Sequence, residues 1–227
     1  MFKLIIYSFL FAIGCLLTEK LDEFEIFFYQ KISFLNLKFV FFSTRIIIGL
    51  LLVQLPLNLL SRIKRLKRTL KVCFSILLFS LPFILSPPDS LEFKYKPTSK
   101  QQKTHLYSYL KQRKSIPTKN TLLCFLTANC RFCKLAGKKI AVISKELETN
   151  DKIQIVLNND STDVIKFLEE IDLSLNFTVH KTTFETLLNI CDGSMPTMFL
   201  MKNDSIINEY SSRSLNDLEI LECLNNN

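Results

Sequence analysis

The chain has 227 residues, a formal net charge of +8 and a mean hydropathy of +0.21, with 20 phenylalanines and no tryptophan. This composition suits neither an ordinary soluble enzyme nor a protein that lies wholly inside a membrane. Four glycines are too few for a glycine-rich phosphate loop, and two histidines are too few for a histidine-based metal centre. Apolar residues concentrate before residue 87 and charged and amide residues after it. We therefore predict a helical membrane region, residues 1–87, followed by a soluble region.

Three apolar runs in the membrane region predict spans near residues 4–18, 39–60 and 71–86. The first run is shorter than the roughly 20 residues that cross a bilayer comfortably, so it is either a short anchor or a cleaved signal. We favour an anchor because no small-x-small cleavage site follows it. The second run contains Arg45, whose charge needs a partner or an interfacial position.

A strongly basic segment, Ser61–Lys71, separates the second and third runs and holds six basic residues and no acidic one. Short loops of this kind stay in the cytoplasm, so we expect everything after Leu85 to lie outside it. The loop after the first run has no excess of basic residues and can lie outside as well. Because topology already explains the basic segment, we expect the lipid bilayer, and no nucleic acid, as a partner.

Beyond the membrane region we expect a linker with a short helix near 104–113, together residues 88–118, and then one domain, residues 119–227. Buried apolar runs predict its strands, and apolar residues at helical spacing predict its helices. The strands are expected at 121–126, 152–157, 177–180, 195–201 and 205–210; the helices are expected over about 20 residues from Cys130 and at 161–171, 183–191 and 215–224. Ser161 or Thr162 is the expected N-cap of the second helix. Alternating strands and helices that end with a hairpin and a helix specify an α/β fold with a mixed sheet.

Two cysteines, Cys130 and Cys133, stand where the first strand of this domain ends and a helix begins. Their spacing brings the sulfurs close enough to bond, and the helix N-terminus stabilises a thiolate at Cys130. Arg131 adds positive charge beside it. We therefore expect Cys130 to be the nucleophile and the less exposed Cys133 to be the resolving thiol of a reversible disulfide.

The segment Phe125–Lys134, followed about 60 residues later by Ser194–Thr197, resembles the paired active-site elements of the thioredoxin superfamily. The resemblance covers residues 119–225 and implies a thioredoxin-like fold. It further implies that Pro196 is in the cis conformation and faces the dithiol, and that Met195 contacts the substrate.

The membrane region is similar to the DoxX/MauE-like segments that precede thioredoxin-like domains in some bacterial envelope proteins. The likeness lies in Lys20–Glu25, Thr44–Leu50 and Leu81–Asp89. Four or more spans are expected in that family, whereas this chain has about three. The resemblance therefore implies an anchor rather than a part that transfers electrons.

The chain departs from thioredoxin at Cys124, which occupies the position of a buried acid that helps to move the proton of the resolving thiol. Glu146 and Glu148 lie on the helix that follows the dithiol, but nothing in the sequence places them beneath it. We therefore assign no base.

The remaining cysteines have simpler interpretations, with one exception. Cys191 precedes Pro196 by five residues in a loop that should approach Cys130, so an accessory resolving or regulatory thiol is one interpretation. The others are expected to be small hydrophobes, namely Cys15, Cys73, Cys124 and Cys223.

Zinc is the main competing use of the Cys130/Cys133 pair, with His180 and Cys191 as further ligands. Structural zinc pairs usually sit in glycine-rich knuckles, whereas this pair starts a long amphipathic helix. We therefore expect no metal, and no cofactor besides the redox-active disulfide Cys130–Cys133.

The leading hypothesis is a membrane-anchored thiol-disulfide oxidoreductase that acts on exported cysteine-containing proteins. It would lie in a bacterial inner membrane with its C-terminal domain on the periplasmic side, and would exchange electrons with a membrane donor or acceptor. The direction of the reaction is open, because a few tens of millivolts reverse it. Two alternatives stay open: a thioredoxin-fold binding or scaffold module without redox turnover, and a metal-binding domain for zinc or copper.

Overall fold

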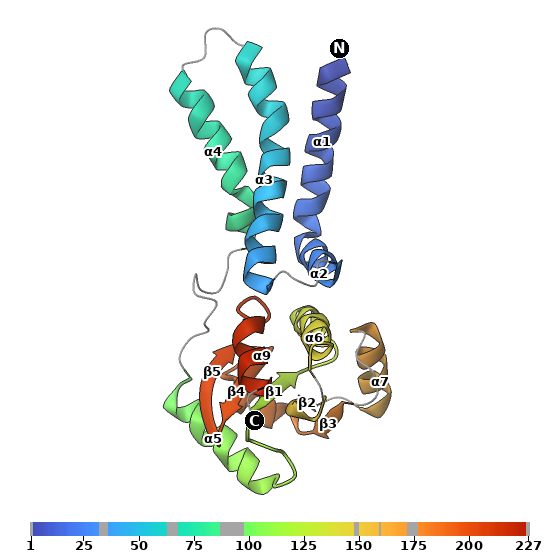
Figure 1. Ribbon diagram of the computed structural model, residues 1–227, viewed down its shortest axis with the longest axis vertical. Coiled ribbons are helices and arrows are strands. Elements are labelled where there is room, and N and C mark those ends of the chain that lie inside the picture. Colours follow the sequence, from blue (N-terminus) through green and yellow to red (C-terminus); the bar gives the residue numbers. More distant parts are fainter. Residues whose placement is uncertain are drawn as a thin grey trace. The chain divides into compact units, whose positions relative to one another are not determined.

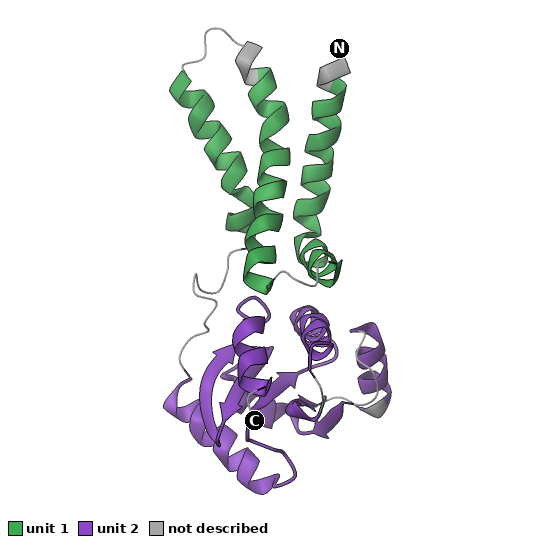
Figure 2. Ribbon diagram, viewed as in Figure 1, with its two compact units in different colours: residues 1–88 green, residues 89–227 purple. Residues whose placement is uncertain are grey.

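The computed structural model describes residues 2–31, 36–62, 68–86, 98–147, 150–158, 160–171 and 177–225. The chain divides into two compact units, Met1–Pro88 and Asp89–Asn227 (Figure 2). Residues 63–67 of the basic segment and residues 87–97 of the linker, on which predictions were made, lie outside the described residues.

The N-terminal unit contains four helices among its described residues, and one of them was not predicted. The four are α1 (Phe2–Glu19), α2 (Leu21–Lys31), α3 (Leu37–Arg62) and α4 (Arg68–Leu85). Helix α3 packs against both α1 and α4, and the N-terminal ends of α1 and α4 lie at the same end of this unit as the C-terminal end of α3 (Figure 1).

Helix α2 occupies the segment that the sequence analysis treated as a loop, so that interpretation was wrong. Its buried residues Leu21, Glu25, Ile26 and Tyr29 recur at the spacing of one helix face. The apolar periodicity of this segment, and not its charges, marks the helix.

The charge of Arg45 finds its partner on α2. The Arg45 Nη1 donates to Glu25 Oε2 at 2.8 Å, and both side chains are buried. The same guanidinium donates from Nε to the Ser86 carbonyl oxygen and from Nη2 to Ser86 Oγ, each at 3.1 Å. A buried ion pair needs such additional hydrogen bonds to offset its desolvation, and here they connect α2, α3 and the end of α4.

Two of the described helices are long and apolar enough to cross a membrane, judged by length and composition. These stretches are Leu37–Leu59 and Arg68–Leu85, whereas α1 contributes the shorter apolar stretch Ile5–Glu19. A third span in α1 therefore stays a prediction.

The C-terminal unit is built on one mixed sheet with the strand order β3-β2-β1-β4-β5. The strands are β1 (Thr121–Leu126), β2 (Ile153–Leu157), β3 (Thr178–Lys181), β4 (Thr197–Lys202) and β5 (Ser205–Tyr210). Strands β1, β2 and β3 are parallel, while β4 is antiparallel to both β1 and β5. Strand β1 is central and wholly buried, as its uninterrupted apolar run predicts.

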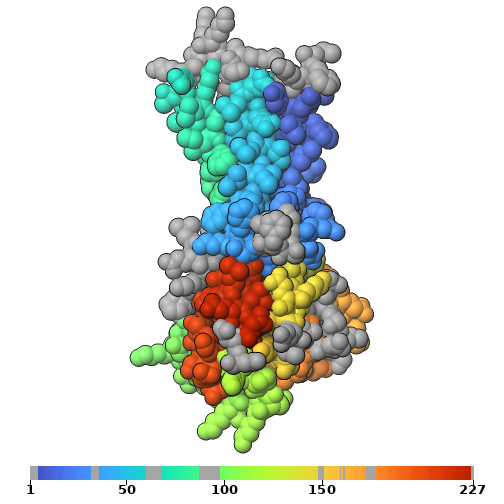
Figure 3. Space-filling view, viewed as in Figure 1, coloured from blue at the N-terminus to red at the C-terminus, as the bar shows by residue number. Residues whose placement is uncertain are grey.

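Helices cover both faces of this sheet, which is the thioredoxin-like arrangement that the resemblance implies (Figure 1). Among the described residues, the helices are α5 (Lys100–Gln112), α6 (Arg131–Ser144), α7 (Ser161–Glu170), α8 (Phe184–Cys191) and α9 (Asp217–Asn225), with a 3-10 turn at Asn150–Lys152. Helices α6 and α9 present their outer surfaces on the same face of the unit (Figure 3).

One hydrophobic core of this unit lies between the sheet and helices α5 and α8. Phe125 of β1 stacks edge-on against Tyr109 of α5 and Phe199 of β4, with ring centroids 6.0 and 5.7 Å apart. Alternation along β1 turns Phe125 toward this cluster and Cys124 toward the opposite face. Packing on both faces of the sheet therefore fixes the position at which the chain leaves β1.

Turn and cap chemistry sets the ends of several elements. Asn203 and Asp204 both have positive φ angles, +49° and +63°, as the tight turn between β4 and β5 requires. Ser99 and Gln102 form a reciprocal capping box, so α5 begins at Lys100, four residues before the expected start.

Two further sequence-based predictions, the end of α6 and the N-cap of α7, were wrong. Helix α6 ends at Ser144, because backbone bonds of the tighter i to i−3 kind close the chain into a turn at Lys145–Leu147, so this helix is shorter than expected. The N-cap of α7 is Asp160, not Ser161 or Thr162.

Candidate functional site

Cys130 is the N-cap of α6, directly beyond the turn that follows the central strand. Its extended backbone, with φ −95° and ψ 122°, lets the sulfur point back over the first helical turn. Cys130 Sγ accepts a hydrogen bond from the backbone N–H of Cys133 at 3.4 Å. The thiol is half-buried, so it is within reach of another molecule.

Cys133 lies one turn further along α6 and is fully buried. Its sulfur accepts a hydrogen bond from the backbone N–H of Thr127 at 3.4 Å. Burial raises the pKa of the Cys133 thiol above its ordinary value; the Thr127 N–H opposes this shift, and the neighbouring Cys130 thiol adds to it. The two thiols are therefore close together but differ in their access to another molecule.

A shallow cavity of about 180 Å³ lies beside the dithiol, and we call it the proline groove. The Met195–Pro196 bond is cis, as the resemblance implies, and both residues line the groove together with Phe132 from between the two cysteines. The remaining lining residues are Ser194, Ser211, Ser212 and Arg213. The structure thus brings two expected site residues, Met195 and Pro196, to one surface next to the dithiol segment.

Positive charge surrounds this end of α6. Arg131 is exposed in its first turn. Lys134 forms an ion pair with Glu170 at 2.7 Å, so part of its charge is offset. The guanidinium of Arg213 lies over the Phe132 ring, with Cζ 5.4 Å from the ring centroid.

Cys191 ends α8 beneath this site rather than on its surface. Its side chain is only 1% exposed, and it does not line the proline groove. Burial raises the pKa of Cys191 to about 12; a hydrogen bond with Thr197 lowers it and the Glu209 charge raises it. Cys191 also raises the pKa of Cys133, so the two thiols lie within electrostatic range of each other.

Cys124 occupies the position at which thioredoxin carries a buried acid, so this site has no acid there. Cys124 is fully buried, and its burial raises the pKa of its thiol. Glu146 lies beyond Ser144, at the opposite end of α6 from Cys130, and Glu148 lies outside the described residues.

A buried carboxyl group that the sequence analysis missed is Glu209 on β5. Its side chain is 3% exposed and accepts a hydrogen bond from Gln102 Nε2 at 3.3 Å. Along the edge strand β5, Glu209 has the same alternation position as Ser205 and Ile207, which are exposed, so the alternation did not predict its burial.

Among the described residues, no three His, Cys, Asp or Glu side chains converge as a metal site. His180, the expected further zinc ligand, lies on β3, where its Nε2 hydrogen-bonds Gln154 Oε1 at 2.7 Å. The described residues therefore do not combine His180 with the dithiol in one set of ligands.

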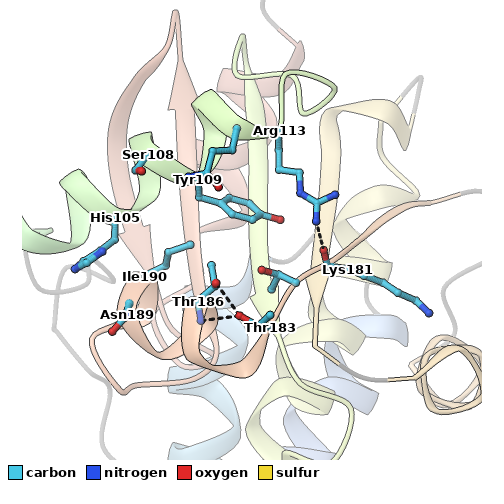
Figure 4. A pocket seen from close by; sticks show the side chains of 11 residues that line it. His105, Ser108, Tyr109, Arg113, Lys181, Thr183, Thr186, Asn189 and Ile190 are labelled. Atoms are coloured by element: carbon cyan, nitrogen blue, oxygen red, sulfur yellow. Dashed lines mark hydrogen bonds between the residues drawn. The ribbon is translucent and has the colours of Figure 1, made fainter.

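A larger cavity, of about 430 Å³, lies between α5 and the segment that joins β3 to α8 (Figure 4). Arg113 Nη2 donates to the Lys181 carbonyl oxygen at 3.1 Å across one end of it, and Thr183 Oγ1 accepts from the Thr186 N–H at 3.2 Å. No cysteine is among its described lining residues, so this cavity is not part of the dithiol site.

The fold and the site together define a thioredoxin-like domain that presents a Cys-x-x-Cys dithiol at the N-terminus of a helix. No protein-family model and no curated protein matches the chain. Its structure is similar to that of a secreted disulfide oxidoreductase from Mycobacterium tuberculosis, described as homologous to E. coli DsbE, with 17% identity, 49% of this chain and 84% of the other covered, and a TM-score of 0.37. It is also similar to a thioredoxin-like protein from Bacteroides caccae, with 14% identity, 82% of this chain and 70% of the other covered, and a TM-score of 0.33.

Proposed function

We propose that this protein is a membrane-anchored thiol-disulfide oxidoreductase that acts on exported cysteine-containing proteins through Cys130 and Cys133. The observation that carries the proposal is the pair itself: Cys130 Sγ caps the helix that contains Cys133, at 3.4 Å from the Cys133 backbone nitrogen. One thiol is accessible and the other is buried behind it, which suits a nucleophile and a resolving thiol.

In the reducing direction, the Cys130 thiolate attacks one sulfur of a substrate disulfide. A bond between Cys130 Sγ and that sulfur forms, and the second substrate sulfur leaves as a thiolate. Cys133 then loses its proton and attacks Cys130 Sγ, which releases the first substrate sulfur. The products are a substrate dithiol and the Cys130–Cys133 disulfide, and the same steps in reverse oxidise a substrate.

The burial of Cys133 has a consequence for this sequence of steps. Its raised pKa keeps it protonated while Cys130 reacts, so its proton must be removed before the second attack. With Cys124 in place of an acid, the departing substrate thiolate or water accepts that proton. We assign substrate contact to Met195 and Pro196 of the proline groove, and charge stabilisation of the Cys130 thiolate to Arg131.

We further propose that residues 1–87 are a shortened DoxX/MauE-like region that anchors the domain in a bacterial inner membrane. The basic segment between α3 and α4 favours a cytoplasmic location for that connection, which would leave the C-terminal unit on the periplasmic side. The N-terminal end of α1 lies at the same end of its unit as the C-terminal end of α3 and the N-terminal end of α4 (Figure 1). This arrangement supports the proposal that α1 crosses the membrane as well. A membrane electron donor or acceptor would then return the dithiol to its starting state.

Turnover of insulin disulfides by the full chain in neutral detergent tests the proposed activity. We expect reduction in the presence of excess dithiothreitol above the rate without protein, loss of this acceleration in Cys130→Ser, and its retention in the matched control Cys73→Ser, whose cysteine is in α4. Cys133→Ser should accumulate a mixed disulfide with insulin through Cys130. Acceleration that survives Cys130→Ser, or none in the folded wild type, would overturn the proposal and favour a scaffold.

The proposed orientation has its own test in bacterial cells. A reporter enzyme that is active only outside the cytoplasm, fused after Asn227, should be active, and the same reporter fused after Arg62 should be inactive. The reverse pattern would contradict the orientation without bearing on the dithiol chemistry.

A further inference from the structure

The turn that follows β5 holds Arg213 at the proline groove in a fixed position. The Ser211 N–H donates to Ser214 Oγ at 2.8 Å, and the Arg213 N–H donates to Ser211 Oγ at 3.2 Å. Lys139 of α6 is only 3% exposed, and its Nζ donates to the Ser212 carbonyl oxygen at 3.0 Å. Because a buried side chain of α6 holds this turn, its position is coupled to the helix that carries the dithiol.

The side chain of Arg213 is positioned but not electrostatically satisfied. Its guanidinium stacks over Phe132, and its Nε–H is buried without an acceptor among the described residues. No acidic side chain among those residues forms an ion pair with Arg213, whereas nearby Lys134 is paired with Glu170. Among the described residues that line the groove, Arg213 is therefore a fixed cation that can still bind a carboxylate.

The chemistry of the guanidinium identifies what it can recognise. A planar guanidinium with several N–H donors binds a carboxylate through two parallel hydrogen bonds, and stacking on an aromatic ring fixes its orientation in advance. The exposed Arg131 adds positive potential at the same end of α6. An extended polypeptide in the groove would lie between Phe132 and Met195–Pro196, with Arg213 beside it.

We propose that Arg213 is a specificity-determining residue that selects disulfide-bearing polypeptides with an acidic side chain close to the reactive cysteine. This inference rests on the proposed oxidoreductase function and assigns its substrate class. The substrate carboxylate accepts hydrogen bonds from the Arg213 guanidinium while the adjacent substrate sulfur meets Cys130.

Three synthetic peptides test the selection. They are identical except for Glu, Gln or Lys beside a single cysteine, which is joined by a disulfide to the same neutral fluorescence-quenching thiol. The reduced full chain in neutral detergent at low salt should show the highest kcat/KM with the Glu peptide and the lowest with the Lys peptide, a ratio of about tenfold for one charge-assisted pair. The difference should lie in KM and shrink as salt rises, because the interaction is made equally before and during exchange. Rates of the same peptides with dithiothreitol correct for their intrinsic reactivity.

Variants assign the selection to Arg213. Arg213→Gln should bring the Glu-to-Lys ratio close to one, Arg213→Glu should invert it, and Arg213→Lys should preserve a smaller preference. Lys166→Gln, which removes an exposed positive charge from α7, is the matched control and should keep the wild-type ratio.

The outcomes separate this inference from the proposed function. Equal corrected rates for the three peptides in the wild type, with exchange still occurring, would overturn the selection and leave the oxidoreductase intact. A wild-type preference that Arg213→Glu leaves unchanged would also overturn it. Absence of exchange with every peptide would instead overturn the proposed function.

Discussion

Replacement of Gly137 by alanine tests how closely α6 is packed against its neighbour. In a helix interior, alanine is favoured over glycine by roughly 0.5–1 kcal/mol, so an open site would be stabilised. Here a Cβ at position 137 would stand 2.6 Å from Ile171 Cδ1, 3.0 Å from its Cγ2 and 3.2 Å from its Cβ. Ile171 is fully buried, so the clash cannot be relieved into solvent. Overpacking of this kind costs about 1–3 kcal/mol, and we expect a net loss of about 1–2 kcal/mol.

Hydrogen exchange of α6 amides in the full chain, followed by mass spectrometry, measures this loss, since about 1.4 kcal/mol corresponds to a tenfold faster exchange through opening. The double variant Gly137→Ala/Ile171→Val lacks the closest contact. Its loss of stability should therefore be smaller than the sum of the losses in the two single variants. Slower exchange in Gly137→Ala, or strict additivity of the two changes, would refute the close packing.

Three further predictions concern ionisable groups. Iodoacetamide at pH 8 should modify Cys130 well before Cys133 and Cys191, because burial raises the pKa of both inner thiols; mass spectrometry of early time points checks the order, and early modification of Cys191 would contradict it. Glu25→Gln should destabilise the N-terminal helices by about 3–5 kcal/mol, because it removes the counter-charge of the buried Arg45; thermal unfolding in detergent, followed by circular dichroism, measures this, and an unchanged midpoint would argue against the pair. The contribution of the neutral Cys191 thiol to the stability of the C-terminal unit should be complete below pH 9 and be lost between pH 9 and about 12. Over this interval the Cys191 thiol ionises when unfolded but stays neutral when buried; urea unfolding at several pH values should show a shallower decline in Cys191→Val.

The central part of the fold could be predicted because its sequence signals are local. The run Thr121–Leu126 is apolar throughout, and a fully buried central strand requires this pattern. Cys130 follows after a short polar turn and caps the helix, so the dithiol could be placed at a strand-to-helix junction from spacing alone. The Lys202–Asp204 turn likewise predicted the β4–β5 hairpin.

Other features depend on contacts between distant segments. Arg213 belongs to a Ser-rich turn with no recognisable motif, and the Lys139–Ser212 hydrogen bond and the stacking on Phe132 hold it at the groove. The buried Glu209 accepts a hydrogen bond from Gln102, which lies 107 positions away in the chain. Helix α2 is different, because its apolar spacing was present in the sequence, where Glu25 was considered only as part of a charged loop.

Equilibration of the full chain in glutathione buffers of graded redox potential, followed by acid quenching and peptide mass spectrometry, tests the central claim most directly. The account predicts that a disulfide joining Cys130 to Cys133 forms and is reduced reversibly, with Cys124 and Cys223 remaining thiols throughout. A folded protein in which Cys130 and Cys133 never join across that range, or in which Cys130 pairs with another cysteine instead, would contradict it.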